Sequence, residues 1–411
     1  MSTILKDNGV SAQANTTSAS AMQFPTWPYY AEDEVAAVAK VLRSGKVNYW
    51  TGDDVRNFEF ALETLSGHKH AIALANGTIA LDFALEALGV GEGDEVICTP
   101  RSFVASASCA LRVGAKPVFA DVDINSQNIT PESIARCITA RTKAVVVVHL
   151  AGWPCDMDGI LEVCNSAGIS VVEDCAQAHG ATINGRPVGS FGKISTWSFC
   201  QDKIISTGGE GGCVTTNDTE LYETLWTFKE HGKSYGKIHD IGYLNQSIGY
   251  KWLHDSLGTN ARMTGLQAAI GQIQLDKLDN WVMKRNANAS YLWSACSNIS
   301  GLRVPSVPSN IRHACYLGYV FVEPERLKKS WSRDRIMNHI LSQNVPVSVG
   351  SCPELYREAL FHAVHDQSVR LPEAQRLGQS SMAFQVHPSI EIKHLERMRS
   401  VIANTLALAV R

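Results

Sequence analysis

The sequence predicts an α/β protein in which a mainly parallel β-sheet is followed by a smaller C-terminal α/β region. Short apolar strands alternate with helical segments through the first part of the chain, and this texture changes after Leu278. The 411 residues are also more than one hydrophobic core usually serves. We therefore expect a disordered tail at 1–22, a large domain at 23–280 and a small domain at 281–411.

The large domain is predicted element by element from apolar spacing and from glycine or proline boundaries. The expected helices are Glu32–Gly45, Asp54–Ser66, Thr78–Leu88, Ser102–Val113, Pro131–Ala140 and Asp158–Ala167. The expected strands are His70–Ala75, Glu95–Thr99, Pro117–Val122, Ala144–His149, Ile169–Asp174, Ile194–Phe199 and Gly212–Thr216. This alternation is typical of a parallel sheet with helices on both faces, and ligands of such sheets bind at the carboxyl ends of the strands.

The small domain is predicted from fewer signals. A long helix is expected over Trp281–Ser294 and a strand over Tyr316–Val322. Further helices are expected near Arg333–Ser342 and Ile392–Leu408.

The bulk composition excludes several classes of protein. The net charge is -3 and no basic run stands out, so we expect no nucleic-acid partner. No apolar stretch is long enough to cross a bilayer, so we expect no membrane partner. The eleven cysteines form no Cys-x-x-Cys pair, which favours free thiols in a reducing compartment over disulfides or a metal site. The N-terminus lacks the features of a signal peptide, and a cytoplasmic protein is expected.

Two runs of sequence carry the chemistry. In the first, Ser198 to Gly212, a lone lysine, Lys203, follows a strand end and precedes a glycine-rich stretch. In the second, Val171 to Gly180, an apolar strand ends in Asp174. An amine that can bond to an aldehyde and an acid that can keep a ring nitrogen protonated are what pyridoxal 5′-phosphate (PLP) requires.

Together, in this order and spacing, the two runs resemble the DegT/DnrJ/StrS family of PLP-dependent nucleotide-sugar aminotransferases. The resemblance extends from about Pro25 to Arg411. It implies the fold of type I PLP enzymes, similar to aspartate aminotransferase, with a seven-stranded sheet. It also implies that Lys203 carries the cofactor and moves the proton, while Asp174 pairs with the pyridine nitrogen. The alternatives are a solvated lysine and a helix-capping aspartate. A dehydrating subgroup of the family has histidine at the lysine position, so lysine favours transamination.

The resemblance places five further residues of this chain around the cofactor. Gly77 and Thr78 would bind the phosphate at the start of a helix, where backbone amides favour an anion; an ordinary turn is the alternative. Ser198 would also contact the phosphate. Phe103 would stack on the ring, although core packing is the common fate of a lone phenylalanine. Gln177 would lie near the ring hydroxyl.

A further segment implies a homodimer with shared active sites. Gly258 to Met263 resembles a family segment whose asparagine reaches the phosphate in the other subunit, which would be Asn260 here; a turn residue is the alternative. Thr259 and Ala261 replace the two tyrosines of the family segment, so contacts of those rings are not expected.

Three residues are candidates for contact with the substrate. His313 would lie near the sugar, with a core or surface histidine as the alternative. Lys233 and Arg262 would offset diphosphate charge, or act as ordinary surface cations.

The resemblance implies amino transfer from L-glutamate to a nucleotide-linked keto-deoxysugar in surface-polysaccharide biosynthesis. The segments 47–52 and 350–356 resemble members from polysaccharide clusters and favour C4 of an NDP-4-keto-6-deoxyhexose, for example UDP-4-keto-6-deoxy-N-acetylglucosamine. One alternative is C3 of a dTDP-3-keto-6-deoxyhexose. The other is a non-catalytic regulatory protein with the PLP fold.

Overall fold

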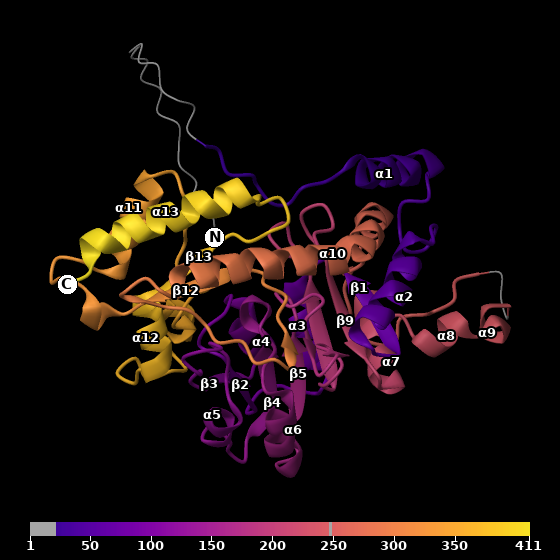
Figure 1. Ribbon diagram of the computed structural model, residues 1–411. Helices are drawn as coiled ribbons and strands as arrows, with labels where there is room; N and C mark the ends of the chain where they lie inside the picture. The colour runs from indigo at the N-terminus through magenta and orange to yellow at the C-terminus, as the bar shows by residue number, and fades with distance from the viewer. Residues whose placement is uncertain (1–21, 246–248) are drawn as a thin grey trace, which may run out of the picture.

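A computed structural model describes residues 22–245 and 249–411 (Figure 1). The expected disordered tail at 1–22 therefore lies outside the described residues, except for Met22. Within the described ranges, none of the helices combines the length and the apolar character needed to cross a membrane.

The large domain is built on one seven-stranded sheet with the strand order β1-β9-β8-β5-β4-β2-β3. The strands are β1 (His70–Leu74), β2 (Glu95–Cys98), β3 (Lys116–Phe119), β4 (Thr142–Val148), β5 (Ser170–Asp174), β8 (Ile194–Ser198) and β9 (Gly212–Thr216). Neighbouring strands from β8 to β3 are parallel, and β9 is antiparallel to both β1 and β8. The predicted sheet, mainly parallel and seven-stranded, is confirmed.

Helices cover both faces of this sheet because successive side chains of a strand point to opposite faces. In β4, Val146 packs with the side chains of α3 and α4, whereas Val145 and Val147 pack with those of α5 and α6. Helices α2 and α10 cover the part of that second face nearest β1. The helices of the large domain are α1 (Glu32–Ser44), α2 (Asp54–Ser66), α3 (Gly77–Ala87), α4 (Ala105–Arg112), α5 (Pro131–Ala135), α6 (Met157–Ser166) and α7 (Thr219–Lys229).

Two of these helices are shorter than predicted. The helix expected from Ser102 begins at Ala105, because Ser102 pairs with Cys352 in an isolated bridge. The helix expected over Pro131–Ala140 ends at Ala135.

The helix predicted over Trp281–Ser294 is present, but it is part of a longer one. One helix, α10 (Gly265–Cys296), runs through the whole stretch and crosses the middle of the molecule (Figure 1). It begins at a capping box in which Thr264 and Gln267 satisfy each other's backbone amides. Gly271 inside the helix allows Phe58 of α2 to pack closely, since a Cβ there would lie 2.5 Å from the Phe58 ring. The expected domain boundary near residue 280 falls inside this helix and stays a prediction.

The C-terminal region packs on the second half of α10. Its sheet has the order β10-β12-β13 and is antiparallel. Its elements are β10 (Leu302–Arg303), β12 (Gly318–Val322), β13 (Ser381–Phe384), α11 (Arg333–Ser342), α12 (Pro372–Ser380) and α13 (Ile392–Ala409). A third sheet has the order β11-β6-β7 and consists of β6 (Thr182–Ile183), β7 (Arg186–Pro187) and β11 (Ile311–Arg312).

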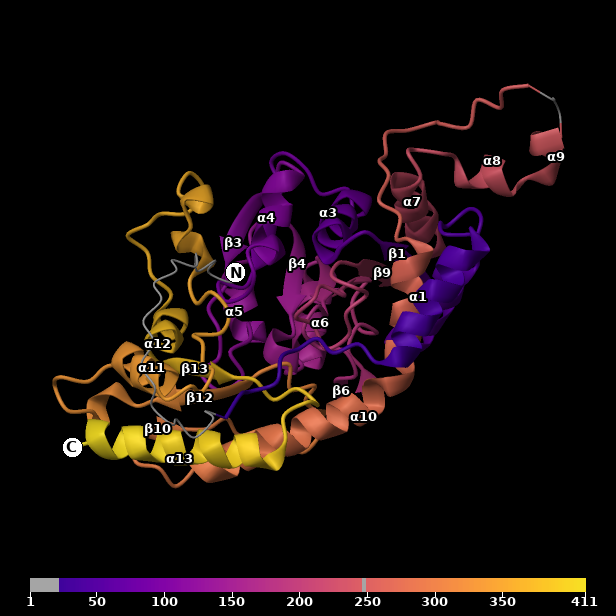
Figure 2. The same ribbon diagram turned by 90° about the horizontal axis from the view of Figure 1, so that it is seen from above.

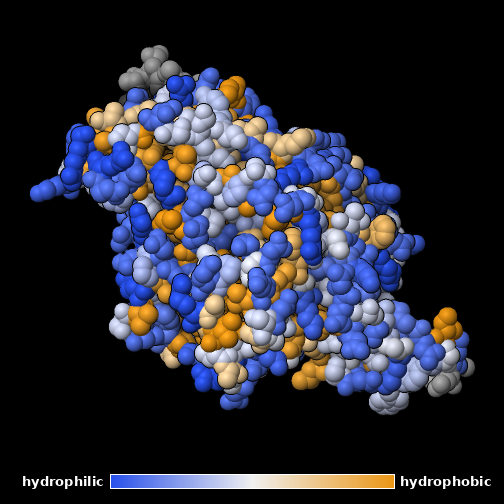
Figure 3. All heavy atoms as spheres, turned by 60° about the horizontal axis from the view of Figure 1, so that its bottom comes forward, coloured by the Kyte–Doolittle hydropathy of each residue, from blue (hydrophilic) through white to orange (hydrophobic). Residues whose placement is uncertain are grey.

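A projecting arm leaves the large domain after α7 and returns before α10. It contains α8 (Tyr235–His239) and α9 (Ile241–Asn245), and it extends away from the body in both ribbon views (Figures 1 and 2). Four large apolar side chains on the arm are exposed: Ile241, Tyr250, Trp252 and Leu257. Figure 3 shows hydrophobic residues on the surface of the projecting arm.

Candidate active site

The largest cavity described has a volume of about 810 Å³ and lies between the sheet and the C-terminal region. Its walls come from five parts of the chain: the segment before α1, the loop after β2, the turn after β5, the loop after β8, and the C-terminal region. The lining residues with polar or aromatic side chains include Trp27, Phe103, Gln177, Asp202, Lys203, Tyr316, Glu358 and His387. The cavity therefore contains three of the residues that the sequence singles out: Phe103, Gln177 and Lys203.

Lys203 lies in a loop whose path is set by backbone hydrogen bonds. Phe199 donates to the carbonyl of Gly211 (2.8 Å), and Thr207 donates to that of Phe199 (3.1 Å). Gly208 and Gly209 have φ values of 83° and 123°, which side chains rarely adopt. The glycine-rich sequence is therefore what allows the loop to turn back onto β8.

The amine of Lys203 has an acidic neighbour. Its Nζ lies 3.4 Å from Oδ1 of Asp202 and 5.1 Å from the centre of the Tyr316 ring. The Tyr316 hydroxyl donates to Oδ2 of Asp202 at 2.5 Å. Burial raises the pKa of Asp202, but Lys203 and the Tyr316 hydroxyl outweigh it, so this pKa lies below its ordinary value. Asp202 is therefore held as a carboxylate beside the lysine.

Asp174 ends β5 and is buried. Its Oδ2 accepts a hydrogen bond from the Ser106 hydroxyl (2.8 Å) and its Oδ1 accepts one from the Ala176 amide (3.1 Å). Burial raises its pKa, and the charge of Lys203 partly offsets this effect. The Ala176 contact is the one expected of a capping residue, but residues 175–178 form a turn and not a helix. A buried carboxylate without a cation in contact suits a cationic ring nitrogen.

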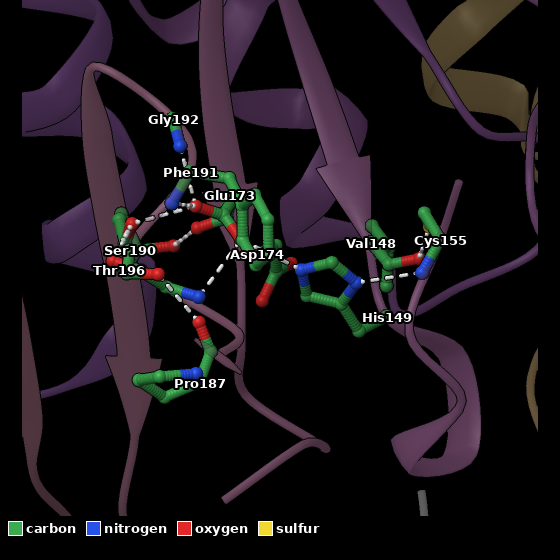
Figure 4. Close-up of polar contacts among 12 residues, drawn as sticks. Val148, His149, Cys155, Glu173, Asp174, Pro187, Ser190, Phe191, Gly192 and Thr196 are labelled. Carbon is green, nitrogen blue, oxygen red and sulfur yellow. Dashed lines mark hydrogen bonds and ion pairs between the residues drawn. The ribbon is translucent and has the colours of Figure 1, made fainter. Parts of the chain in front are cut away.

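The residue before Asp174 is fixed by a separate network (Figure 4). Glu173 is fully buried and accepts from the amides of Gly189 (2.8 Å), Phe191 (2.8 Å) and Gly192 (2.6 Å). The Nε2 of His149 lies 3.0 Å from the same carboxylate. Burial raises the pKa of Glu173, but the contacts with His149 and the backbone amides lower it by more. The pKa therefore lies below its ordinary value.

Three residues of this network lie close enough together to be considered as ligands of a metal ion. Ligand atoms of His149, Glu173 and Cys175 lie within 4.8 Å of one another. However, the Nδ1 of His149 accepts from the Cys155 amide (3.0 Å), and the oxygens of Glu173 already have several donors. The group therefore lacks the free lone pairs that a metal ion needs.

The predicted phosphate contacts come together at the start of α3. The side chain of Asn76 caps this helix by accepting from the Ile79 amide (2.9 Å). Within the described residues, the amides of Gly77 and Thr78 have no acceptor. A Cβ on Gly77 would lie 2.7 Å from Cβ of Ser198, so the first turn of α3 packs directly on the end of β8. The site thus has a glycine cradle, a Ser hydroxyl and free amides, which suit an anion.

The two residues predicted to contact the cofactor ring both line the cavity. Phe103 is 52% exposed and lines the cavity, so it is not a core residue. Gln177 lines the same cavity, and its Oε1 accepts from the Ala151 amide (2.7 Å), which leaves its amide nitrogen to face a ligand oxygen.

The comparisons with known proteins agree with this geometry. The family model of the DegT/DnrJ/EryC1/StrS aminotransferase family matches residues 28–403. The chain belongs to this family. An aminotransferase from Psychrobacter cryohalolentis has a similar crystal structure, with a TM-score of 0.90 and 48% identity over 94% of this chain and 99% of that one. This aminotransferase is therefore PLP-dependent, as the sequence predicts.

Two curated relatives extend the comparison. The spore coat polysaccharide biosynthesis protein SpsC of Bacillus subtilis is 34% identical over 88% of this chain and 92% of its own length. A UDP-N-acetyl-3-dehydro-alpha-D-glucosamine 3-aminotransferase of Acidithiobacillus ferrooxidans is 32% identical over 91% of this chain and 94% of its own.

The aminotransferase has residues suited to each functional group of PLP: the phosphate, the ring nitrogen and the aldehyde. Gly77, Thr78 and Ser198 would hold the phosphate, and Asp174 the ring nitrogen. Lys203 would bind the aldehyde carbon. When bound, the cofactor supplies an electron-withdrawing ring that lets an amino group leave one carbon and join another.

Four predicted residues are not part of the cavity wall, the end of β5 or the group at the start of α3. Asn260 is exposed at the base of the arm, in a backbone bridge with Glu230. Arg262 is paired with Glu230 at 2.7 Å, and Lys233 lies 4.7 Å from the Trp50 ring. None of these three residues lines the cavity of its own chain.

The structure does not bring His313 to the cavity either. Its ring is buried beside the rings of Trp153 and Trp293, and its Nδ1 accepts from the Cys315 amide (2.8 Å). Burial lowers its pKa to about 3, so it is neutral. His313 is therefore a core histidine, which was the alternative to a substrate contact, because aromatic rings replace water around it.

Sequence reasoning missed three residues around the lysine. Trp27 and Tyr316 are distant in sequence and gave no signal. Asp202 lies directly before Lys203, and an acid beside a lone lysine at a strand end was a signal that could have been used.

Proposed function

We propose that this aminotransferase moves an amino group from L-glutamate to the keto carbon of a nucleotide-linked deoxysugar. The observation that carries the proposal is the position of Lys203, part-buried at the wall of a cavity of about 810 Å³ that also has Phe103 and Gln177 in its walls. Such a volume has room for a substrate beside a cofactor. The similarity to SpsC supports a role in surface-polysaccharide biosynthesis.

The residues of the chain would act in stages. Lys203 would hold the cofactor until the donor amine arrives, and its freed Nζ would then be placed to move a proton at the substrate carbon. Asp174 would keep the ring nitrogen protonated. Glutamate would depart before the ketosugar enters, so ping-pong kinetics are expected.

The charges of the cavity support a shared site. Among the described residues that line it, Lys203 is the one cation, since burial lowers the pKa of His387 to about 4. Asp202 and Glu358 add negative charge. A nucleotide diphosphate therefore needs cations from elsewhere, and Lys233 and Arg262 at the arm base of a second copy would provide them.

The exposed arm supports a homodimer. Trp252 is 76% exposed and Leu257 is 90% exposed, in a part of the chain that projects from the body. Large apolar side chains in such a place are typical of an interface. We propose that the arm packs on a partner subunit and brings its Asn260 to the partner's phosphate site.

The shared site can be tested by mixing two inactive variants. Asn260→Ala and Lys203→Ala homodimers should both be weak, and mixing with subunit exchange should restore activity, because one site of each mixed dimer keeps both native residues. No recovery on mixing would assign Asn260 to its own chain.

The substrate is tested with a panel of nucleotide ketosugars. The PLP-loaded protein is incubated with glutamate and each sugar, and the product mass is read, with Lys203→Ala as the control. We keep C4 of an NDP-4-keto-6-deoxyhexose as the preferred position. The similarity to a 3-aminotransferase supports C3 as a second candidate. Amination of neither sugar, with glutamate still consumed, would overturn the proposed acceptor.

A further inference from the structure

The segment of residues 24–30 joins the C-terminal region to the wall of the cavity. It precedes α1 and crosses the molecule from the side of α13 to α1 (Figure 2). At one end, the Phe24 ring lies 5.2 Å from that of His394 in α13. In the middle, residues 24–27 line the cavity. The segment therefore contacts both regions and the site between them.

Trp27 is the point where this segment meets the lysine loop. Its indole Nε1 donates to the backbone carbonyl of Lys203 at 2.7 Å, a contact between residues 176 positions apart. A second contact lies close by, where the Tyr30 hydroxyl is 2.9 Å from the Ser206 hydroxyl. Both contacts fix the same loop, which is also held by its own turns, by the Tyr316 hydroxyl on Asp202 and by a bond from the Ser206 amide to Gln274 (2.8 Å).

The indole itself is held on three sides. Its ring is stacked on His387 (5.6 Å, 27°) and meets the Trp281 ring edge-on (5.1 Å, 86°). The guanidinium of Arg285 lies 5.0 Å from its centre. His387 follows β13 of the C-terminal region, and Trp281 and Arg285 belong to α10. The direction of the indole N–H is therefore set by side chains from both regions.

Arg285 connects this cluster to the other neighbour of the lysine. It is fully buried and donates from Nη1 to the carbonyl of Tyr316 (3.3 Å), whose ring lies beside Lys203 Nζ. Within the described residues it has no acidic partner. The Trp27 ring and backbone carbonyls are thus what compensate its charge.

We propose that Trp27 is a positioning residue for Lys203. Its indole N–H fixes the backbone at the lysine, so that the direction of Nζ depends on how the segment 24–30 is seated on the C-terminal region. This inference rests on the proposed function of Lys203. It adds a coupling between the two regions that the cofactor contacts alone do not provide.

The test separates the N–H from the packing of the ring. Trp27→Phe keeps an aromatic ring and removes the donor. Trp281→Phe is the matched control, because it makes the same change in the same cluster at a ring with no hydrogen bond to Lys203. Two measurements are made on cofactor-free protein: backbone hydrogen exchange of residues 199–207, and the rate of covalent PLP capture followed by absorbance. Visible circular dichroism of the loaded protein then reports the orientation of the cofactor.

Trp27→Phe should speed exchange at Lys203 and Thr207 and slow PLP capture by about fivefold to tenfold, the scale of one lost hydrogen bond. It should also change the visible dichroism. Trp281→Phe should stay within about twofold of wild type in both measurements. Wild-type behaviour of Trp27→Phe, or an equal effect of both variants, would overturn the inference.

A second variant tests the inference if Trp27→Phe does not fold. Tyr30→Phe removes only the contact to Ser206, and it should raise exchange at residues 203–207 without changing the melting temperature of the chain. Unchanged exchange in this variant would then overturn the inference. If the wild-type protein captures no PLP, the proposed function fails, while the exchange measurement still decides the role of Trp27.

Discussion

The sequence predicts both Asp174 at the end of β5 and Asn260 at the base of the arm near the cofactor, but their surroundings differ. Glu173 precedes Asp174 in the same strand. Glu173 and Asp174 are buried between β4 and β8, and hydrogen bonds to their own chain fix both carboxylates. Asn260 is exposed and lies on an arm that leaves the body. Contacts within one chain are enough to position the two carboxylates. Asn260 has no such enclosure, and it would need the surface of another subunit to lie near a cofactor. One chain therefore brings together most of the residues proposed to hold the cofactor, whereas the proposed contact of Asn260 with the phosphate would need a second chain.

The largest effect is expected at Lys203. Lys203→Ala should abolish turnover, because no other lysine among the described residues lines the cavity to bind the cofactor or carry the proton. Lys193, an exposed lysine directly before β8, gives the matched control Lys193→Ala, which should remain active. Steady-state turnover with glutamate and a ketosugar measures both variants. An active Lys203→Ala protein would contradict the assignment of Lys203 as the cofactor-binding residue.

A smaller loss is expected at Asp174. Asp174→Asn should still bind PLP but lower the rate of the glutamate half-reaction on the order of 100-fold, because the ring nitrogen loses its anionic partner and its proton. Single-turnover absorbance measures this rate, and Asp158→Asn on the surface is the control. A near wild-type rate would leave Asp174 as a residue that only holds the 175–178 turn.

Glu173 should matter for stability. Glu173→Gln places an amide NH₂ among three backbone donors, and we expect a loss of about 2 to 4 kcal/mol in the free energy of unfolding. Urea denaturation measures it, with exposed Glu162→Gln as the control. A loss below about 0.5 kcal/mol, the usual size of a surface substitution, would show that the network does not hold β5.

The same residue gives a pH dependence. Its folded pKa is lowered, so the stabilisation is complete above the ordinary value of 4.5 and is lost as the pH falls through the folded value. Below pH 4.5 the wild type should therefore lose stability more steeply than Glu173→Gln. Parallel slopes would contradict the lowered pKa.

The smallest effect on the single chain is expected at the arm. Trp252→Ser should leave the unfolding of the chain nearly unchanged, because this side chain is 76% exposed, but it should weaken the dimer. Sedimentation over a range of concentrations measures the dissociation. Leu408→Ser, an exposed apolar residue of α13, is the control. If both variants sediment like wild type, the arm is not the interface.

The same contrast explains what the sequence could predict. Alternating apolar runs such as 144–148 predict the sheet because burial on both faces demands them. Asp174, Lys203 and Gly77 stand beside strand ends, so local sequence indicates their place. The contact of Trp27 with Lys203 joins distant segments, and no local pattern carries it. His313 shows the reverse case, in which a polar residue in a suggestive segment is buried by aromatic neighbours that sequence order does not reveal.

The most direct test of the account is chemical trapping of the bound cofactor. The protein is loaded with PLP, reduced with borohydride, digested, and its peptides are analysed by mass spectrometry. We predict a pyridoxyl group on the peptide that contains Lys203, and loss of that label when glutamate is added before reduction. A label on another lysine, or none at all in protein that is folded, would contradict the central claim.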